Sequence, residues 1–311
     1  MTTFWIILTA CLASAACALV GTYLVLRKQA MLGDAISHAV LPGIAIAFLL
    51  TASRNTFPML LGAGAFGLLT VYLTEKLQER GRLMNDASMG IVFTTLFAIG
   101  VIIITLFASS VDLDHECILF GEIAYVPWDI WFFAGMNMGP RPVWILGLVL
   151  VINLIFILGC YKELKIYAFD RQLAVSMGIP VAFIHYGLMG TVSFSTIASF
   201  ESVGAILVVA LIVVPPATAY LLTRRLSVML VLAVAFGVLS SLSGYYLAYI
   251  TNTSIAGAIA VMAGIFFALA LFFSPLDGVF IRRNRKVTLE APEAVAGMAA
   301  GKNREDSIPL T

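Results

Sequence analysis

The stretch Met31-Leu32-Gly33-Asp34-Ala35-Ile36-Ser37-His38-Ala39-Val40-Leu41-Pro42-Gly43 opens an apolar segment that runs to about residue 52. It carries an acid and an imidazole four residues apart, and positions i and i+4 of an α-helix lie on the same face. A carboxylate in the middle of a membrane span costs about 2.5 to 3.5 kcal/mol, so it is rarely left there without a partner or a task. We therefore predict that Asp34 and His38 hold one cation between them on an ion pathway.

Pro42 and the small residues around it sharpen this prediction. Pro42 has no amide hydrogen, so the carbonyl oxygen of His38 loses its usual helical donor. A carboxylate, an imidazole and a backbone carbonyl suit Mn²⁺, Fe²⁺ or Zn²⁺ better than Mg²⁺. Ala35, Ala39 and Gly43 form a ridge of small residues along which another helix can pack closely. The alternative interpretation is that the acid and the imidazole only satisfy each other inside a helix bundle.

The composition is that of an integral membrane protein. Of the 311 residues, 61% are hydrophobic and 11% are charged, and the mean hydropathy is +1.02. Soluble domains carry about 25% charged residues, so the lipid bilayer is the expected surrounding and a large soluble domain is excluded. The net charge of +1 argues against nucleic acid as a partner. The cysteines at 11, 17, 117 and 160 form neither a disulfide framework nor a CxxC metal site.

Nine apolar segments are long enough to cross about 30 Å of hydrocarbon. The stretch 183–222 has to be divided, because about forty helical residues would reach about 60 Å. The first segment is interpreted as a retained span and not as a signal peptide, because its apolar run continues to Leu26. The expected spans lie near residues 4–26, 31–52, 57–75, 88–108, 143–161, 183–200, 203–222, 227–250 and 254–274.

Basic residues fall on alternate connections between these spans. One side receives only Arg54 and Arg141. By the positive-inside rule the N-terminus lies outside and the C-terminus lies in the cytoplasm. An eight-span chain would leave the last basic clusters outside, so we predict an all-α integral membrane protein with about nine transmembrane helices, eight being the alternative. The basic clusters of the inner side lie at 27–28, 76–82, 162–171, 224–225 and 282–286.

The longest outer connection is acidic. The loop from Ser109 to Pro142 carries five carboxylates against one arginine, and an acidic mouth would raise the local concentration of cations or dock a delivery protein. Within it, the run Asp114–Cys117 resembles a row of metal ligands, but adjacent residues point different ways, so we interpret it as a solvated loop. Glu201 lies at the outer turn between the sixth and seventh spans.

A second informative stretch, residues 162–180, lies on the inner side. Asp170 is predicted to cap a short helix that ends before Gly178. Such a helix between two spans is what a membrane protein needs to press against a soluble partner, and the alternative is an interfacial helix lying on lipid. Its residues expected toward one side are Leu173, Ala174 and Met177.

The sixth and seventh spans hold further polar or helix-breaking residues. The pair Pro215-Pro216 is predicted to break its helix and to free the carbonyl oxygens of Leu211 and Ile212. A break at membrane depth persists only where it lines a cavity or is buried in protein, so both a structural kink and a place on the pathway stay open. His185 has no obvious acidic partner in the sequence, and we interpret it as a satisfied helix residue.

The C-terminal part of the sequence contains no ATP-hydrolysing motif. The run Gly301-Lys302-Asn303 lacks the first glycine and the hydroxyl residue of G-x-x-x-x-G-K-[ST], so an ATPase motif is absent from the sequence. From residue 282 the chain is basic, then rich in Ala, Gly and Glu. We expect a transmembrane domain at 1–281 and a disordered cytoplasmic tail at 282–311.

Five blocks of this sequence resemble the membrane permease of bacterial ABC transporters that import manganese, zinc or iron, the ABC-3 family. The resemblance covers about residues 1–280. It departs from the family pattern at residues 139–142, at Glu201 and in the tail, and Glu201 is interpreted as an added cation contact. The blocks are Arg27 to Gly43, Asp86 to Gly90 (DASMG), Leu119 to Glu122 (LFGE), Asp170 to Gly178 (DRQLAVSMG) and Val203 to Ala219.

The resemblance implies a set of partners and roles. Members of this family work as two permease chains, identical or paralogous, with two cytoplasmic ATP-binding subunits and an extracytoplasmic metal-binding protein. It implies that Asp34 and His38 are metal ligands of the pathway. It also implies an ATPase-coupling helix at about 170–178, whose family positions here are Asp170, Ala174 and Gly178.

The function predicted from the sequence is therefore that of a permease in an ATP-driven importer of a divalent transition metal, in the bacterial plasma membrane. We expect no catalytic site and no permanently bound cofactor, and Glu201, Pro215 and Pro216 are further pathway candidates. One alternative is a secondary metal transporter driven by a proton or sodium gradient. Another is an intramembrane metal-dependent hydrolase, which lacks HExxH, GxSxG and a second carboxylate-histidine pair. A plain scaffold would leave the buried acid unexplained.

Overall fold

The computed structural model of the chain describes residues 2–51, 56–81, 83–107, 122–133 and 136–274. Within these ranges, nine helices are long and apolar enough to cross a membrane. The predicted all-α membrane fold and its span count are therefore confirmed for this part of the chain. The acidic run 112–117 and the tail 282–311 lie outside the described residues.

The helices follow the predicted spans, with ends that differ by several residues, and the second span consists of two short helices. The strands β1 (Ile130–Phe133) and β2 (Met136–Pro140) form an antiparallel hairpin. In chain order the helices are α1 (Thr2–Leu26), α2 (Leu32–Ala39), α3 (Leu41–Thr51), α4 (Thr56–Gly81), α5 (Asn85–Phe107), the 3-10 helix η1 (Ile123–Trp128), α7 (Arg141–Gly159), α8 (Tyr161–Phe169), α9 (Arg171–Ser176), α10 (Val181–Val203), α11 (Ala205–Leu222), α12 (Leu226–Thr251) and α13 (Ile255–Phe273).

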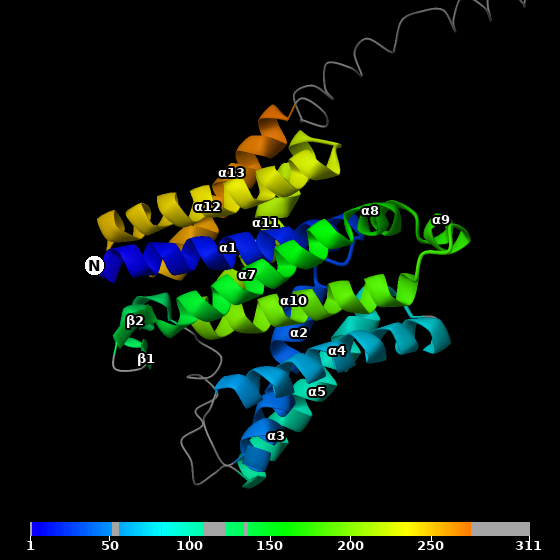
Figure 1. The fold of residues 1–311 in the computed structure, drawn as a ribbon, viewed down its shortest axis with the longest axis horizontal. Helices are drawn as coiled ribbons and strands as arrows, with labels where there is room; N and C mark the ends of the chain where they lie inside the picture. Colours follow the sequence, from blue (N-terminus) through cyan, green and yellow to red (C-terminus); the bar gives the residue numbers. More distant parts are fainter. Residues whose placement is uncertain (1, 52–55, 82, 108–121, 134–135, 275–311) are drawn as a thin grey trace, which may run out of the picture.

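Helix α1 lies at the centre of the bundle, where it packs against α12, α11, α7 and α10 (Figure 1). Its small side chains let these neighbours approach, and Ala13, Ala16 and Ala18 are fully buried. The closest approach is at Gly21, where an added Cβ would lie 2.0 Å from the carbonyl oxygen of Ile212 in α11. Only a glycine fits there, so α1 and α11 touch backbone to backbone.

The second span is interrupted at Val40, the single residue between α2 and α3. Pro42 follows in the first turn of α3, where it has no hydrogen to donate to the preceding turn. Glycines of two other helices pack against this region: a Cβ on Gly62 would lie 2.5 Å from the Gly43 oxygen, and one on Gly100 would lie 2.7 Å from the Pro42 nitrogen. The predicted ridge of small residues therefore serves close packing, because Gly43 of α3 packs against Gly62 of α4.

The long apolar stretch 183–222 is divided, as predicted, but the division falls at Gly204 and not at Glu201, which lies within α10. The Gly204 N–H donates to the Phe200 oxygen of α10 at 3.0 Å, and its oxygen accepts from the Val208 N–H of α11 at 3.2 Å. It adopts φ +85° and ψ 160°, a conformation that is essentially restricted to glycine. A single residue thus ends α10 and begins α11.

The predicted break at Pro215-Pro216 is wrong. Helix α11 continues through both prolines to Leu222. Proline removes one hydrogen bond from a helix, but neighbouring helices in a membrane bundle can hold the backbone in place. Both prolines are buried, and the Ile212 backbone in the preceding turn is pressed against α1, which explains why the helix does not open.

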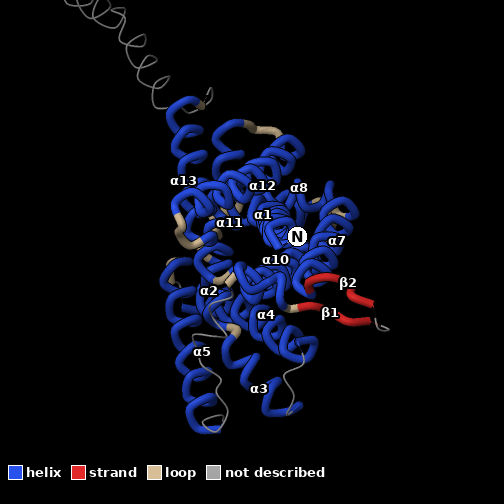
Figure 2. Tube along the Cα trace, turned by 90° about the vertical axis from the view of Figure 1, so that its left-hand side faces the viewer, coloured by secondary structure: helices blue, strands red, loops and turns tan. Residues whose placement is uncertain are grey.

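The hairpin and helix α8 were not predicted, and they lie at opposite ends of the molecule. The hairpin lies at the same end as the N-terminus, whereas α8 and α9 lie at the other end (Figures 1 and 2). The hairpin is tied to α1 at Gly139, which has φ +87° and whose Cβ would lie 2.8 Å from the Trp5 ring. Its strands have four and five residues, too few to show an alternating pattern.

Candidate metal site

Asp34 and His38 face each other on α2. His38 Nε2 lies 3.5 Å from Asp34 Oδ1, and the two side chains are 38% and 32% exposed. The imidazole is flanked by two rings of α5, with centroid distances of 5.8 Å to Phe93 and 6.1 Å to Phe97. The predicted placement on one helix face is confirmed, and the role of the pair as metal ligands stays a prediction.

The separation of the two polar atoms suits one ion. Transition metals bind such atoms at about 2.0 to 2.2 Å, and at a tetrahedral angle two ligand atoms then lie about 3.4 Å apart. The observed 3.5 Å matches this geometry. Among the described residues, no group of three or more His, Cys, Asp or Glu side chains could hold a metal. In the described part of this chain the pair therefore brings together two polar groups that are 38% and 32% exposed.

The surroundings of α2 connect the site to the proline-containing helix. Helix α2 packs against α5, α4, α10 and α11 and lies near the middle of the long axis of the bundle (Figure 1). The contact with α11 is made at Gly33, where an added Cβ would lie 3.1 Å from the Ile212 side chain. Pro215 and Pro216 follow Ile212 by one turn, so their helix touches the residue that precedes Asp34.

Glu201 lies on a different helix from Asp34 and His38. It is an exposed residue in the last turn of α10, close before Gly204. Helix η1, which packs against α10 and α1, lies at this end of the molecule. Trp128, the last residue of η1, is 76% exposed, and Trp131 of β1 is 44% exposed. Such exposure is expected of aromatic residues at a membrane interface.

The short helix α9 forms as the sequence predicts. Asp170 Oδ1 accepts hydrogen bonds from the Gln172 N–H at 2.8 Å and the Leu173 N–H at 3.0 Å, which caps the first turn. At the other end Gly178 has φ +74°, and the Ile179 N–H donates to the Ala174 oxygen at 3.1 Å, a bond typical of a Schellman motif. Both ends of α9 are thereby fixed.

The faces of α9 differ from the prediction. Ala174 is fully buried, whereas Leu173, Val175 and Met177 are 49%, 60% and 60% exposed. Leu173, Ala174 and Met177 therefore do not share one face, because Ala174 packs against the rest of the chain. The exposed apolar residues of α9 form the surface that is open to a partner.

His185 has polar partners within the bundle, as interpreted, and one of them is an acid that is distant in the sequence. His185 is 3% exposed, and its Nε2 lies 2.6 Å from Glu75 Oε1 of α4. Tyr167 of α8 and Arg27 at the end of α1 contact the other ring nitrogen. Sequence inspection missed this group because its members are distant in the chain. The available signal was a histidine and a glutamate both placed within apolar helices.

A groove of about 700 Å³ opens between α4, α7 and α10. Its lining is mostly apolar, as at Leu60, Ile145 and Phe194. The polar residues of the lining are Asp129, Arg141, Asn153 and Thr191. Asp34 and His38 are not among the residues that line it. The groove is therefore separate from the candidate metal site.

Comparison with known proteins places this arrangement in a family. Residues 1–274, which include all nine spans, match the family model described as the ABC 3 transport family. The chain belongs to this family. It is a multi-pass membrane protein and a permease component of ABC transport systems, as the sequence resemblance implied.

Two curated members of the ABC 3 transport family are similar to the chain over most of its length. The manganese transport system membrane protein MntD of Bacillus subtilis is 50% identical over 290 residues, covering 93% of this chain and 98% of that protein. The zinc transport system membrane protein TroD of Treponema pallidum is 43% identical over 281 residues, covering 90% of this chain and 76% of that protein.

A solved structure supports the same fold. The structure titled PsaBC from Streptococcus pneumoniae in complex with Fab has a TM-score of 0.72 and 33% sequence identity, covering 88% of this chain and 92% of that chain. The bundle of this ABC 3 family member is thus shared along nearly its whole length with a known relative.

Proposed function

We propose that this chain is the membrane permease of an ATP-driven importer of a divalent transition metal, and that Asp34 and His38 hold the ion during its passage. The observation that carries the proposal is the pair itself. A carboxylate oxygen and an imidazole nitrogen lie 3.5 Å apart on the second span, in a chain whose relatives are named for manganese and zinc transport. Manganese is the first cation to test, because the relative with 50% identity carries that name.

The half-exposed face of the pair is where a second permease chain, identical or paralogous, would complete the site. Cytoplasmic ATP-binding subunits would act on α9, and an extracytoplasmic metal-binding protein would deliver the ion at the hairpin end. The ion would be released when the ATP-driven change of state alters its contacts with the two permease chains.

The gradient-driven alternative differs in one measurable respect. Metal uptake into vesicles would then proceed without the ATP-binding subunits and would collapse on addition of an uncoupler. The proposed importer instead requires ATP and the ATP-binding subunits, and an uncoupler leaves its initial rate unchanged. Uptake of radioactive Mn²⁺ into proteoliposomes, with and without ATP, separates the two.

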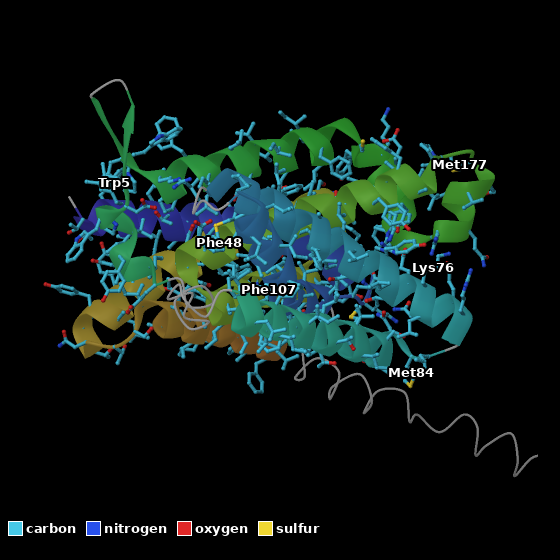
Figure 3. All side chains as sticks on the ribbon, turned by 90° about the horizontal axis from the view of Figure 1, so that it is seen from below. Trp5, Phe48, Lys76, Met84, Phe107 and Met177 are labelled. Atoms are coloured by element: carbon cyan, nitrogen blue, oxygen red, sulfur yellow. The ribbon has the colours of Figure 1, made fainter. Side chains whose placement is uncertain are left out.

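The orientation of the chain can be tested at its two ends. Trp5 lies at one end of the molecule, and Lys76 and Met177 lie at the other (Figure 3). In a cysteine-free background, we expect Thr3→Cys to react with a membrane-impermeant maleimide from outside the cell. The matched control Ser176→Cys on α9 should react only after the membrane is opened. Labelling of Ser176→Cys in intact cells would contradict the N-out topology.

The exposed side of α9 gives a second test. We expect Val175→Asp to weaken binding of the ATP-binding subunits at least about tenfold, because a central apolar contact contributes about 1 to 2 kcal/mol or more. Val175 is 60% exposed, so the melting temperature of the isolated permease should not change. The control Ala174→Asp places a charge at a fully buried position. It should lower both the binding of the ATP-binding subunits and the melting temperature of the permease. Normal binding by Val175→Asp would contradict docking at α9.

A further inference from the structure

Four polar residues from four parts of the chain, Arg27, Glu75, Tyr167 and His185, form what we call the inner cluster. His185 Nε2 lies 2.6 Å from Glu75 Oε1, and its Nδ1 lies 2.6 Å from the Tyr167 hydroxyl oxygen and 3.0 Å from Arg27 Nη1. The Arg27 guanidinium carbon lies 4.3 Å from the centre of the Tyr167 ring. The cluster therefore joins the end of α1 to α4, α8 and α10 through direct contacts.

Two donors of the inner cluster share one acceptor. A guanidinium can only donate hydrogen bonds, so Nδ1 of His185 is an acceptor, and its single lone pair faces both Arg27 and the Tyr167 hydroxyl. The ring hydrogen then lies on Nε2, the nitrogen that is 2.6 Å from Glu75 Oε1. Burial raises the pKa of Tyr167 to about 12, which keeps its hydroxyl protonated and able to donate at neutral pH. The four groups thus form one continuous set of polar contacts, with a positive charge at one end and a negative charge at the other.

Stability alone does not explain such a set. A buried ionic group replaced by apolar side chains of similar volume is often neutral or stabilising, whereas polar contacts fix the relative position of the elements that carry them. His185 and Tyr167 are 3% and 2% exposed, so these contacts are largely shielded from water. The inner cluster therefore specifies one arrangement of the four helices at this end.

The cluster lies where α9 meets the transmembrane helices. Tyr167 is in the last turn of α8, and α9 begins after Asp170. The charge of Arg171, the first residue of α9, opposes the rise in the pKa of Tyr167. On the other side of the loop, His185 is near the start of α10. Any displacement of α9 relative to the bundle therefore acts on the residues of the cluster.

On its other side the cluster is connected to α2 by a stiff corner. Arg27 directly follows α1, and the next residue, Lys28, has φ +57°, a left-handed conformation that costs a non-glycine residue about 1 to 2 kcal/mol. The Gln29 N–H donates to the Leu24 oxygen at 2.9 Å, and the Leu32 N–H donates to the Gln29 oxygen at 3.0 Å. A shift of Arg27 is therefore passed to the start of α2.

We propose that the inner cluster positions α2 relative to α9, so that movement of the coupling helix reaches the Asp34–His38 pair. The proposal rests on the proposed function, because it assumes that α9 receives the action of the ATP-binding subunits. Its four members are positioning residues and do not contact the transported ion.

The test compares Glu75→Gln with Glu79→Gln in the complete transporter, in proteoliposomes with Mn²⁺. Glu79 lies one turn further along α4, where it is 64% exposed and 3.8 Å from Lys76. For Glu75→Gln we expect the ratio of Mn²⁺ taken up to phosphate released to fall about fivefold, the effect of a coupling change near 1 kcal/mol. For Glu79→Gln the ratio should equal that of the unchanged protein.

Two further variants test the role of the inner cluster independently of Glu75→Gln. Tyr167→Phe removes only the hydroxyl and should lower the same ratio, which carries the test if Glu75→Gln does not assemble. The double variant Glu75→Gln with His185→Gln should be no worse than Glu75→Gln alone, because the two residues act as a unit. If uptake and hydrolysis fall in proportion in all variants, the cluster is only structural and the proposal is overturned.

Failure of the proposed function gives a different result. In that case the unchanged protein would show no ATP-dependent Mn²⁺ uptake, and no ratio could be formed. If instead the unchanged protein couples uptake to ATP, and both Glu75→Gln and Tyr167→Phe keep the full ratio, only the inference about the cluster is wrong.

Discussion

Asp34→Asn is expected to lower metal uptake by at least about 100-fold, because even the loss of an outer partner of a metal ligand costs about 10- to 100-fold. The substitution keeps the shape of the side chain but removes its negative charge. Asp34 is the only carboxylate that contacts His38 among the described residues. Because the side chain is 32% exposed, the fold does not depend on its charge, and the variant should insert and assemble normally.

The measurement is ATP-dependent uptake of Mn²⁺ and Zn²⁺ into proteoliposomes that hold the complete transporter. Assembly is checked in parallel by co-purification of the ATP-binding subunits and by the melting temperature of the complex. Asp34→Glu serves as the matched control, because it keeps the charge while it moves the carboxylate by one methylene, and it should retain part of the uptake. Normal uptake by an assembled Asp34→Asn complex would remove Asp34 from the pathway.

Gly21→Ala is expected to destabilise the protein by about 3 kcal/mol or more, because inserting a methyl group into a filled core costs about 1 to 3 kcal/mol and occasionally more. The added carbon would lie 2.0 Å from the carbonyl oxygen and 2.9 Å from the carbonyl carbon of Ile212. Backbone atoms cannot turn away as a flexible side chain can. Helices α1 and α11 must therefore separate, and α1 is the central helix.

The control for this prediction is Gly147→Ala in α7. No atom lies within 4 Å of a Cβ at Gly147, and alanine is favoured over glycine in a helix by about 1 kcal/mol. This variant should therefore be as stable as the unchanged protein or slightly more so. Thermal unfolding in detergent measures both, and equal melting temperatures for Gly21→Ala and Gly147→Ala would show that α1 and α11 do not touch at Gly21.

The features that the sequence predicted correctly depend on local chemistry. The spans follow from apolar length, the facing of Asp34 and His38 follows from helix periodicity, and the cap at Asp170 and the turn at Gly178 follow from side-chain and backbone preferences. Each of these is decided within a few residues. Tertiary packing therefore had little opportunity to override them.

The features that it missed depend on contacts between distant residues. The contact of Glu75 with His185 joins α4 to α10, and no pattern in either helix specifies it. Pro215 and Pro216 break an isolated helix, but α11 continues through both in the bundle, with Ile212 packed against Gly21. The burial of Ala174 likewise depends on how α9 lies on the bundle. The metal-binding role of Asp34 and His38 remains a prediction for experiment.

The single-residue junction at Gly204 has a mechanical consequence. With a single residue between them, the end of α10 and the start of α11 are held together at this turn. His185 lies near the far end of α10, and Ile212 of α11 contacts Gly33 beside Asp34. This turn gives the inner cluster a second connection to α2, besides the corner at Lys28, so the loss of either connection alone would leave the other in place.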